Sequence, residues 1–132
     1  MIAHITLVTG ARTDAREAAI ARELKADVPT AVILEGLPSG SSVLPMEPLP
    51  AALSIARIAP GCLCCIGNLT LRVTLNRMLR KRPQRIYVGV ADASHLSTLV
   101  EFLSAAPYDD LLRLTPIIDC DAPHGTTQQD RD

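Results

Sequence analysis

Short apolar runs that alternate with helix-like segments constrain the fold of this chain more than any other feature. Four runs of β-branched and aliphatic residues have the length and composition of strands; they are residues 4–10, 30–36, 53–59 and 85–90. Three other segments carry apolar residues at helical spacing; they are residues 13–27, the stretch from Asn68 or Thr70 to Pro83, and residues 92–106. Strands that alternate with helices predict an α/β fold with a mostly parallel sheet and flanking helices.

Two further segments complete this predicted domain, a last strand and a long internal loop. Residues 111–119 form a fifth strand-like run that contains Pro116, and a proline cannot donate to a sheet, so we expect an edge position or a local irregularity there. The proline-rich residues 36–50 predict a long loop, either a tolerated insertion or a contact element for a partner. We therefore expect a single layer-packed domain over residues 1–122 and a disordered polar tail over residues 123–132.

Charge and hydropathy exclude several classes of function. The chain has 132 residues with 13 Lys and Arg against 14 Asp and Glu, so it lacks the basic excess expected of a protein that binds nucleic acid or anionic membranes. No apolar run approaches the roughly 20 residues of a spanning helix, and the first residues lack a secretory pattern. We expect a cytoplasmic protein, in which cysteines stay reduced and serve as ligands or reactive thiols.

The stretch "GCLCC" at residues 61–65 is the strongest chemical signal. Thiolates of Cys62, Cys64 and Cys65 between two glycines can converge on one soft metal ion, and Zn²⁺ takes thiolates in a tetrahedral shell. Three sulfurs leave one position open; its candidates are Cys120, Glu35, His4, His95, His124 and a water molecule. Cu(I) would also accept such thiolates. We predict a transition-metal site, with zinc as the expected metal.

Other roles for the cysteines stay open. Free cysteines are often buried as small apolar residues, and this is the favoured interpretation for Cys120. A redox pair formed by Cys64 and Cys65 is less favoured than metal binding, because a disulfide between adjacent residues is strained.

The order of these elements and motifs resembles the CobW-like P-loop GTPases, which are cytoplasmic metal chaperones and metal-insertion proteins. The resemblance runs from about residue 4 to residue 122 and is carried by "APGCLCCIGNL", "RPQRIYVGVADASHL" and "LTPIIDCDA". The family has a Gly-Cys-x-Cys-Cys motif after its phosphate loop. The resemblance implies a P-loop-NTPase-like fold, a zinc-binding role for Cys62, Cys64 and Cys65, and Glu35 as their acidic partner.

The sequence departs from this family where nucleotide chemistry is carried out. A working phosphate loop follows the pattern GxxxxGK[ST], but here the stretch is "GARTDAREA". Gly10 is retained, whereas Ala15, Arg16 and Glu17 stand at the positions of the second glycine, the lysine and the Mg²⁺-binding hydroxyl. Gly10 and Arg16 are thus the remnants of a nucleotide site, and the guanine-reading motif is missing. We do not expect GTP with Mg²⁺ to be a cofactor, nor the chain to hydrolyse GTP alone.

These observations favour a metallochaperone-like accessory protein that serves a metal-handling or metalloenzyme client, with a homodimer as one way to complete the metal shell. Two alternatives remain: a divergent GTPase completed by a partner chain, and a docking subunit with no metal role.

Asp14 followed three residues later by Glu17 also predicts a capping box at the start of the first helix.

Overall fold

A computed structural model describes residues 2–25, 27–36, 52–58, 69–91 and 93–121. Its strands are β1 (Ala3–Thr9), β2 (Thr30–Glu35), β3 (Leu53–Ile58), β4 (Arg85–Val90), β5 (Leu112–Leu114) and β6 (Ile118–Asp119). Its α-helices are α1 (Thr13–Glu23), α2 (Leu69–Leu79) and α3 (Leu96–Ser104), with short 3-10 helices η3 (Ala93–His95) and η4 (Tyr108–Asp110). The predicted α/β fold is confirmed.

All described strand pairs are parallel, and they form one sheet. The strand order is β3-β2-β4-β1-β5, and β6 pairs with β1 beyond the end of β5. Gly89 of β4 lies between Leu34 of β2 and Val8 of β1, which fixes the register across the centre of the sheet. A parallel sheet buries both faces, and β1 and β2 are accordingly buried along almost their whole length.

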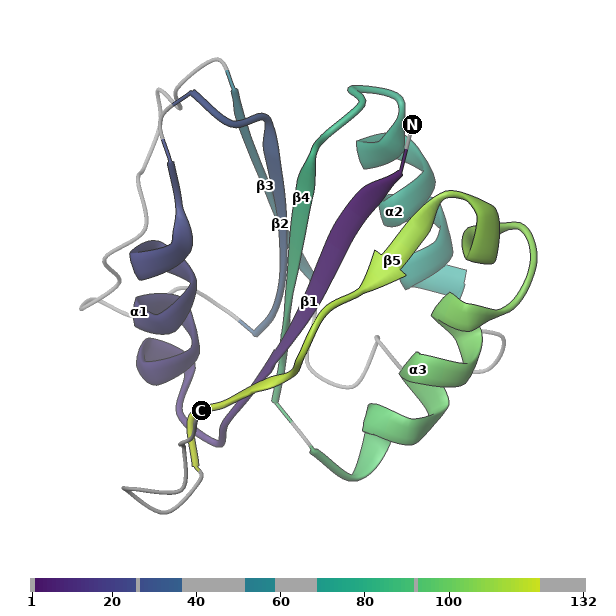
Figure 1. Cartoon of the computed structure of the whole chain (residues 1–132). Helices are drawn as coiled ribbons and strands as arrows, with labels where there is room; N and C mark the ends of the chain where they lie inside the picture. Colours follow the sequence, from purple (N-terminus) through teal and green to yellow (C-terminus); the bar gives the residue numbers. More distant parts are fainter. Residues whose placement is uncertain (1, 26, 37–51, 59–68, 92, 122–132) are drawn as a thin grey trace.

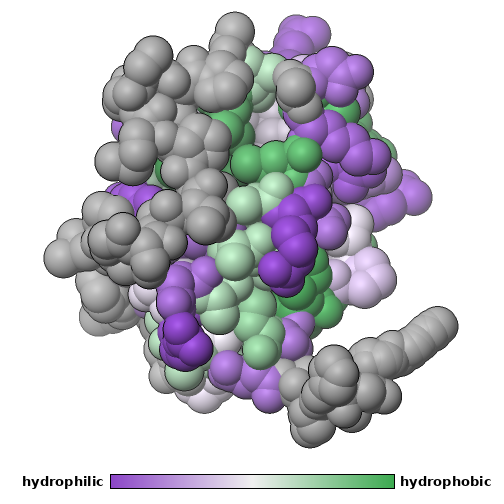
Figure 2. All heavy atoms as spheres, turned by 90° about the vertical axis from the view of Figure 1, so that its left-hand side faces the viewer, coloured by the Kyte–Doolittle hydropathy of each residue, from purple (hydrophilic) through white to green (hydrophobic). Residues whose placement is uncertain are grey.

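The helices divide between the two faces of the sheet (Figure 1). Helices α2 and α3 cover one face, over a core that includes Leu75, Leu99 and Ile5. Helix α1 covers the other face, where Ile20 packs in a smaller cluster with Val8. Figure 2 shows the α1 side as a mixture of hydrophilic and hydrophobic surface, in keeping with the charged residues and alanines that alternate in α1.

The predicted irregularity at Pro116 is present and divides the last strand into β5 and β6. The amide of Thr115 still donates to the carbonyl of Ile5 at 2.9 Å, and the pairing with β1 resumes at Ile118. Since β5 is at one end of the strand order, the proline occupies an edge of the sheet, where its missing amide hydrogen is tolerated.

The predicted capping box at α1 is wrong. The helix begins at Thr13, its N-cap residue Arg12 makes no side-chain capping bond, and Asp14 lies inside the first turn. Asp14 accepts hydrogen bonds from the guanidinium of Arg12 at 2.6 and 3.1 Å, which lowers the pKa of the carboxyl group below its ordinary value. The helix also ends at Glu23, four residues before the expected boundary at Asp27.

Some expectations concern parts of the chain outside the described residues. They are the loop at 37–51, the cysteine segment within 59–68 and the tail from residue 122. Within the described part, every helix is too short or too polar to cross a membrane.

Candidate functional site

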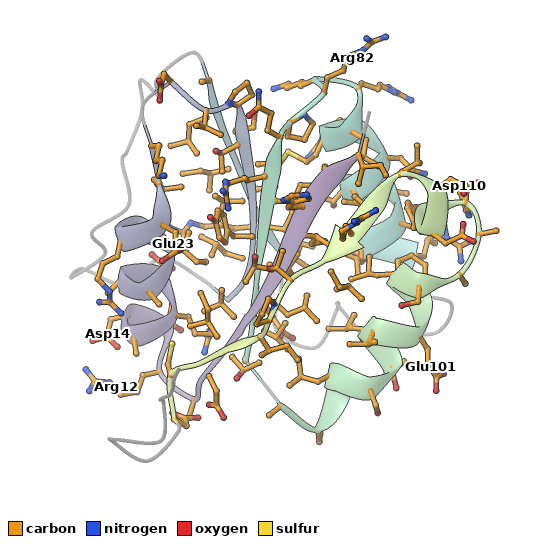
Figure 3. All side chains as sticks on the ribbon, viewed as in Figure 1. Arg12, Asp14, Glu23, Arg82, Glu101 and Asp110 are labelled. Atoms are coloured by element: carbon orange, nitrogen blue, oxygen red, sulfur yellow. The ribbon has the colours of Figure 1, made fainter. Side chains whose placement is uncertain are left out.

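The carboxyl ends of the parallel strands meet at one edge of the sheet, the place where open α/β sheets bind their ligands. Three residues mark this edge: Gly10 follows β1, Glu35 ends β2 and Ala91 follows β4. Figure 3 shows Arg12 and Asp14 at this edge, at the start of α1, whereas Arg82 lies at the opposite edge. Arg82, which belongs to the basic stretch that follows α2, is therefore remote from the candidate site.

Glu35 is the predicted metal partner that the structure describes most fully. Its residue is only 3% exposed, and its Oε1 accepts a hydrogen bond from the amide of Ala91 at 2.9 Å. Glu35 pairs in register with Ile58, the last residue of β3, and the amide of Gly36 donates to the carbonyl of Ile58 at 2.8 Å. The chain therefore leaves β3 beside the backbone of Glu35.

The motif cysteines Cys62, Cys64 and Cys65 follow Ile58 in the sequence and lie outside the described residues. Among the residues that are described, no three His, Cys, Asp or Glu side chains are grouped closely enough to hold a metal ion. A metal site at this edge would therefore have to include residues outside the described ranges, and the motif cysteines between β3 and α2 are among these.

The other candidates for the fourth ligand are placed differently. His4 lies near the start of β1, about 16 Å of strand away from the carboxyl edge. Cys120 follows β6 and is half-buried, with its Sγ 3.6 Å from the carbonyl oxygen of Ala15. Burial raises the pKa of the Cys120 thiol, and the carboxylates of Asp121 and Asp119 act in the same direction. The backbone of His95 lies in η3, and His124 is outside the described residues.

Arg16, predicted to be a remnant of the phosphate site, is turned into the protein. It is 2% exposed, and its guanidinium donates to three oxygens. Nη1 donates to the carbonyl of Gly10, while Nη2 donates to Oγ1 of Thr13 at 3.2 Å and to the carbonyl of Glu35 at 3.0 Å. Arg16 thus joins the end of β1, the start of α1 and the end of β2.

The next residue, Glu17, forms an ion pair that the sequence analysis missed. Its carboxylate, 1% exposed, accepts two hydrogen bonds from Arg57 of β3, at 2.7 and 3.3 Å. The sequence offered one signal for this ion pair. Glu17 is a charged residue on the same helix face as the apolar Ile20, and Arg57 is a charged residue within the apolar run "LSIARI". Helix α1 is therefore fastened to β2 through Arg16 and to β3 through Glu17.

The loop between β1 and α1 is also held by the segment after β6. The amide of Ala11 donates to Oδ2 of Asp121 at 2.9 Å, so a carboxylate of the chain binds an amide of the loop between β1 and α1. A Cβ atom on Gly10 would lie 2.9 Å from Cβ of Cys120, which is too close for two carbon atoms. Glycine is required at position 10 for this approach.

Comparison with known proteins adds one partial similarity. The chain is 30% identical over 61 residues, 46% of its length, to the zinc chaperone YeiR of Escherichia coli (strain K12). It spans about a fifth of that protein, since the match covers 19% of the relative. No family profile matches the chain, and no solved structure matches it. The similarity supports at most a relationship with the CobW-like proteins, to which the sequence motifs also point.

Proposed function

We propose that this chain binds a transition metal, zinc in the first place, through Cys62, Cys64 and Cys65 with Glu35 as a further ligand. The observation that carries the proposal is the register of β2 and β3, which brings the exit of β3 beside Glu35. Cys62 comes four residues after Ile58, and four residues of chain span at most about 14 Å. This reach is compatible with thiolates that meet the buried carboxylate of Glu35.

The donor set fits zinc chemically. Three thiolates and one carboxylate oxygen would complete a four-coordinate shell of the kind that Zn²⁺ prefers. The bond from the Ala91 amide to Glu35 would orient the carboxylate, as outer partners of metal ligands commonly do. The zinc chaperone that resembles part of the chain supports the choice of metal.

We further propose that the protein is an accessory or metallochaperone-like member of the CobW-like group without GTPase activity of its own. Two contacts where the phosphate loop would lie support this view. The guanidinium of Arg16 donates hydrogen bonds to three oxygens of the protein, and the amide of Ala11 donates to the carboxylate of Asp121. The rival proposal, a divergent GTPase completed by another chain, would require these contacts to open. The proposed partner is a metal-handling or metalloenzyme client, or a second copy that supplies a ligand.

A zinc competition titration against a chromophoric chelator, on freshly reduced protein, tests the metal proposal. Changing each motif cysteine to serine is expected to weaken zinc binding by about tenfold or more, because a thiolate ligand is lost. Glu35→Gln should also weaken it, whereas Asp110→Asn, in an exposed residue far from the sheet edge, serves as the control (Figure 3). The proposal fails if the unchanged protein holds zinc no more tightly than the Cys64→Ser variant.

A further inference from the structure

Strand β3 ends the strand order, so one of its edges has no neighbouring strand among the described residues (Figure 1). Most of β3 is half-buried, whereas every residue of β2 is buried. The carbonyls of Ala52 and Ile58 each accept a hydrogen bond at 2.8 Å from the side of β2. Backbone groups of successive residues in a strand point to opposite edges, so the even-numbered residues of β3 face β2. The residues whose backbone groups face away from β2 are Leu53, Ile55 and Arg57.

The two ends of the sheet differ as templates for an added strand. β3 runs for six residues in unbroken register with β2. At the other end, β5 has three residues, and Pro116, which comes shortly after it, has no amide hydrogen to donate. Long, regular edges are the ones that accept further strands, so β3 is the edge suited to this role.

A cationic groove lies beside this edge, between β3 and α2. Two adjoining hollows, of about 210 and about 230 Å³, are both lined by Ser54, Met78 and Lys81. Nζ of Lys81 donates to Oγ of Ser54 at 3.2 Å, and Arg77 lines the second hollow together with Ile55. Both cationic residues are exposed, and neither is in an ion pair within the described part of the chain. No acidic side chain is among the described residues that line either hollow.

The spacing of the two cations matches the repeat of a β-strand. Lys81 comes four residues after Arg77, and its amide donates to the carbonyl of Met78 at 3.0 Å, so it continues the turn of α2. Four residues of helix rise about 6 Å, and two residues of strand rise about 6.6 Å. Side chains at alternate positions of a strand beside β3 are therefore spaced to meet Lys81 and Arg77 in turn. The side chains that complement these cations are carboxylates.

Other occupants fit this surface less well. A second copy that paired through its own β3 would bring two cationic grooves together, and like charges across strands destabilise their pairing. A nucleic acid would engage the cations but not the row of backbone groups on β3, which calls for another peptide backbone.

We propose that the outer edge of β3 is a docking site for an extended acidic segment of a partner protein. The segment pairs with β3 as an added strand and sets carboxylates at alternate positions against Lys81 and Arg77. In this mode of recognition the main-chain hydrogen bonds provide affinity and the side chains provide specificity. The surface shares no residue with the proposed metal site, so we expect the same binding with zinc and with a chelator.

The first test measures the binding of labelled peptides to the full chain by fluorescence anisotropy. The probe is a short peptide in which two glutamates alternate with valines, and its control carries glutamines instead. Arg77→Ala and Lys81→Ala should each weaken binding of the probe by about two- to fivefold, the range of an exposed ion pair. Arg80→Ala is the matched control, because Arg80 is an exposed neighbour that lines neither hollow.

Reversal of charge gives a sharper result. A variant that combines Arg77→Glu with Lys81→Glu should lose the glutamate peptide and bind a peptide with lysines at the same positions. Arg80→Glu should keep the preference of the unchanged protein for glutamate.

Backbone methylation tests whether the peptide binds as a strand. In a strand, the amides of the glutamates point to one edge and those of the valines to the other. Methylation of one of these two sets of amides should therefore abolish binding, and methylation of the other should leave it intact. Hydrogen exchange at the amides of Leu53, Ile55 and Arg57 should slow when the peptide binds.

Four results would overturn the proposal. They are equal binding of the glutamate and glutamine peptides, equal losses in Arg80→Ala and Lys81→Ala, binding of both methylated peptides, and no binding at millimolar peptide. In the last case Lys81 and Arg77 only guard the edge against unwanted pairing. A dimer that is broken by changes in β3, without peptide binding, would identify a second copy as the occupant and also refute the proposal.

Discussion

Glu17 of α1 and Arg57 of β3 form a two-pronged ion pair across the α1 face of the sheet, with Nη1 and Nη2 of Arg57 2.7 and 3.3 Å from the two carboxylate oxygens. The two partners differ in burial, because the Glu17 side chain is 1% exposed and the Arg57 side chain 23%. The pair links α1 to β3, the strand that leads toward the cysteine segment. Because one partner is more buried than the other, removing Glu17 and removing Arg57 should lower stability by different amounts.

We expect Arg57→Met to lower the free energy of unfolding by about 3 kcal/mol and Glu17→Gln by about half as much. Arg57→Met deprives a buried carboxylate of its guanidinium partner, whereas Glu17→Gln leaves a charge that can still reach water. Urea denaturation checks both values, with Arg77→Met in the exposed part of α2 as the control. Equal losses of unfolding free energy from the two changes would contradict the expectation that we draw from the difference in burial.

Gly10→Ala should destabilise the protein by about 1–3 kcal/mol, the usual cost of forcing an extra carbon into a packed position. Its Cβ would meet Cβ of Cys120 at 2.9 Å, and neither atom can rotate away. Gly89→Ala is the comparison, because its Cβ would meet the flexible end of Leu34 at 3.2 Å. Thermal unfolding should rank Gly10→Ala well below Gly89→Ala, and the reverse order would show that the segment at Cys120 yields easily.

Two tyrosines allow the contribution of a side-chain hydrogen bond to the free energy of unfolding to be measured. The hydroxyl of Tyr87 is buried and has no hydrogen-bond partner within the described residues, whereas the hydroxyl of Tyr108 donates to Oδ1 of Asn76 at 2.6 Å. Tyr87→Phe should leave stability unchanged or raise it slightly, and Tyr108→Phe should cost about 1 kcal/mol. A clear loss for Tyr87→Phe in denaturant titrations would mean that its hydroxyl is bonded in solution.

The thiol of Cys120 should react slowly with alkylating reagents near neutral pH. Burial raises its pKa, Asp121 and Asp119 add to the rise, and the arginines Arg22 and Arg16 oppose it. The thiolate is the reactive form, so the rate with iodoacetamide should rise at a higher pH in the folded protein than in urea. A variant with the three motif cysteines changed to serine isolates this thiol, and equal pH profiles in both states would refute the expectation.

The same shift predicts how stability depends on alkaline pH. A thiol with a raised pKa in the folded state contributes stability that is fully present below the pKa of the unfolded chain and is lost as the pH rises through the folded pKa. The unfolding temperature should therefore fall at alkaline pH, and it should fall less in Cys120→Ser. Differential scanning calorimetry at several pH values measures the difference.

Local patterns predicted the fold well because they report which residues are buried. The apolar runs gave β1 to β4 to within about a residue or two at each end, and Pro116 correctly predicted an irregular edge strand. The site was harder to predict, because its contacts join distant parts of the chain. Arg16 reaches the carbonyl of Glu35 across 19 residues, and Arg57 meets Glu17 across 40. The motif comparison assigned Arg16 to the position of the phosphate-loop lysine, but such a comparison does not say whether the side chain turns toward a ligand or into the protein.

The place of β1 in the sheet has a consequence for synthesis on the ribosome. β1 lies between β4 and the segment of β5 and β6, and contacts such as that between Thr6 and Thr115 join residues 109 positions apart. Contacts of such long sequence separation form slowly, and strands left unpaired in the meantime are prone to aggregate. Strand β1 is therefore synthesised more than a hundred codons before its second neighbour, and a nascent-chain chaperone would have most to protect during that interval.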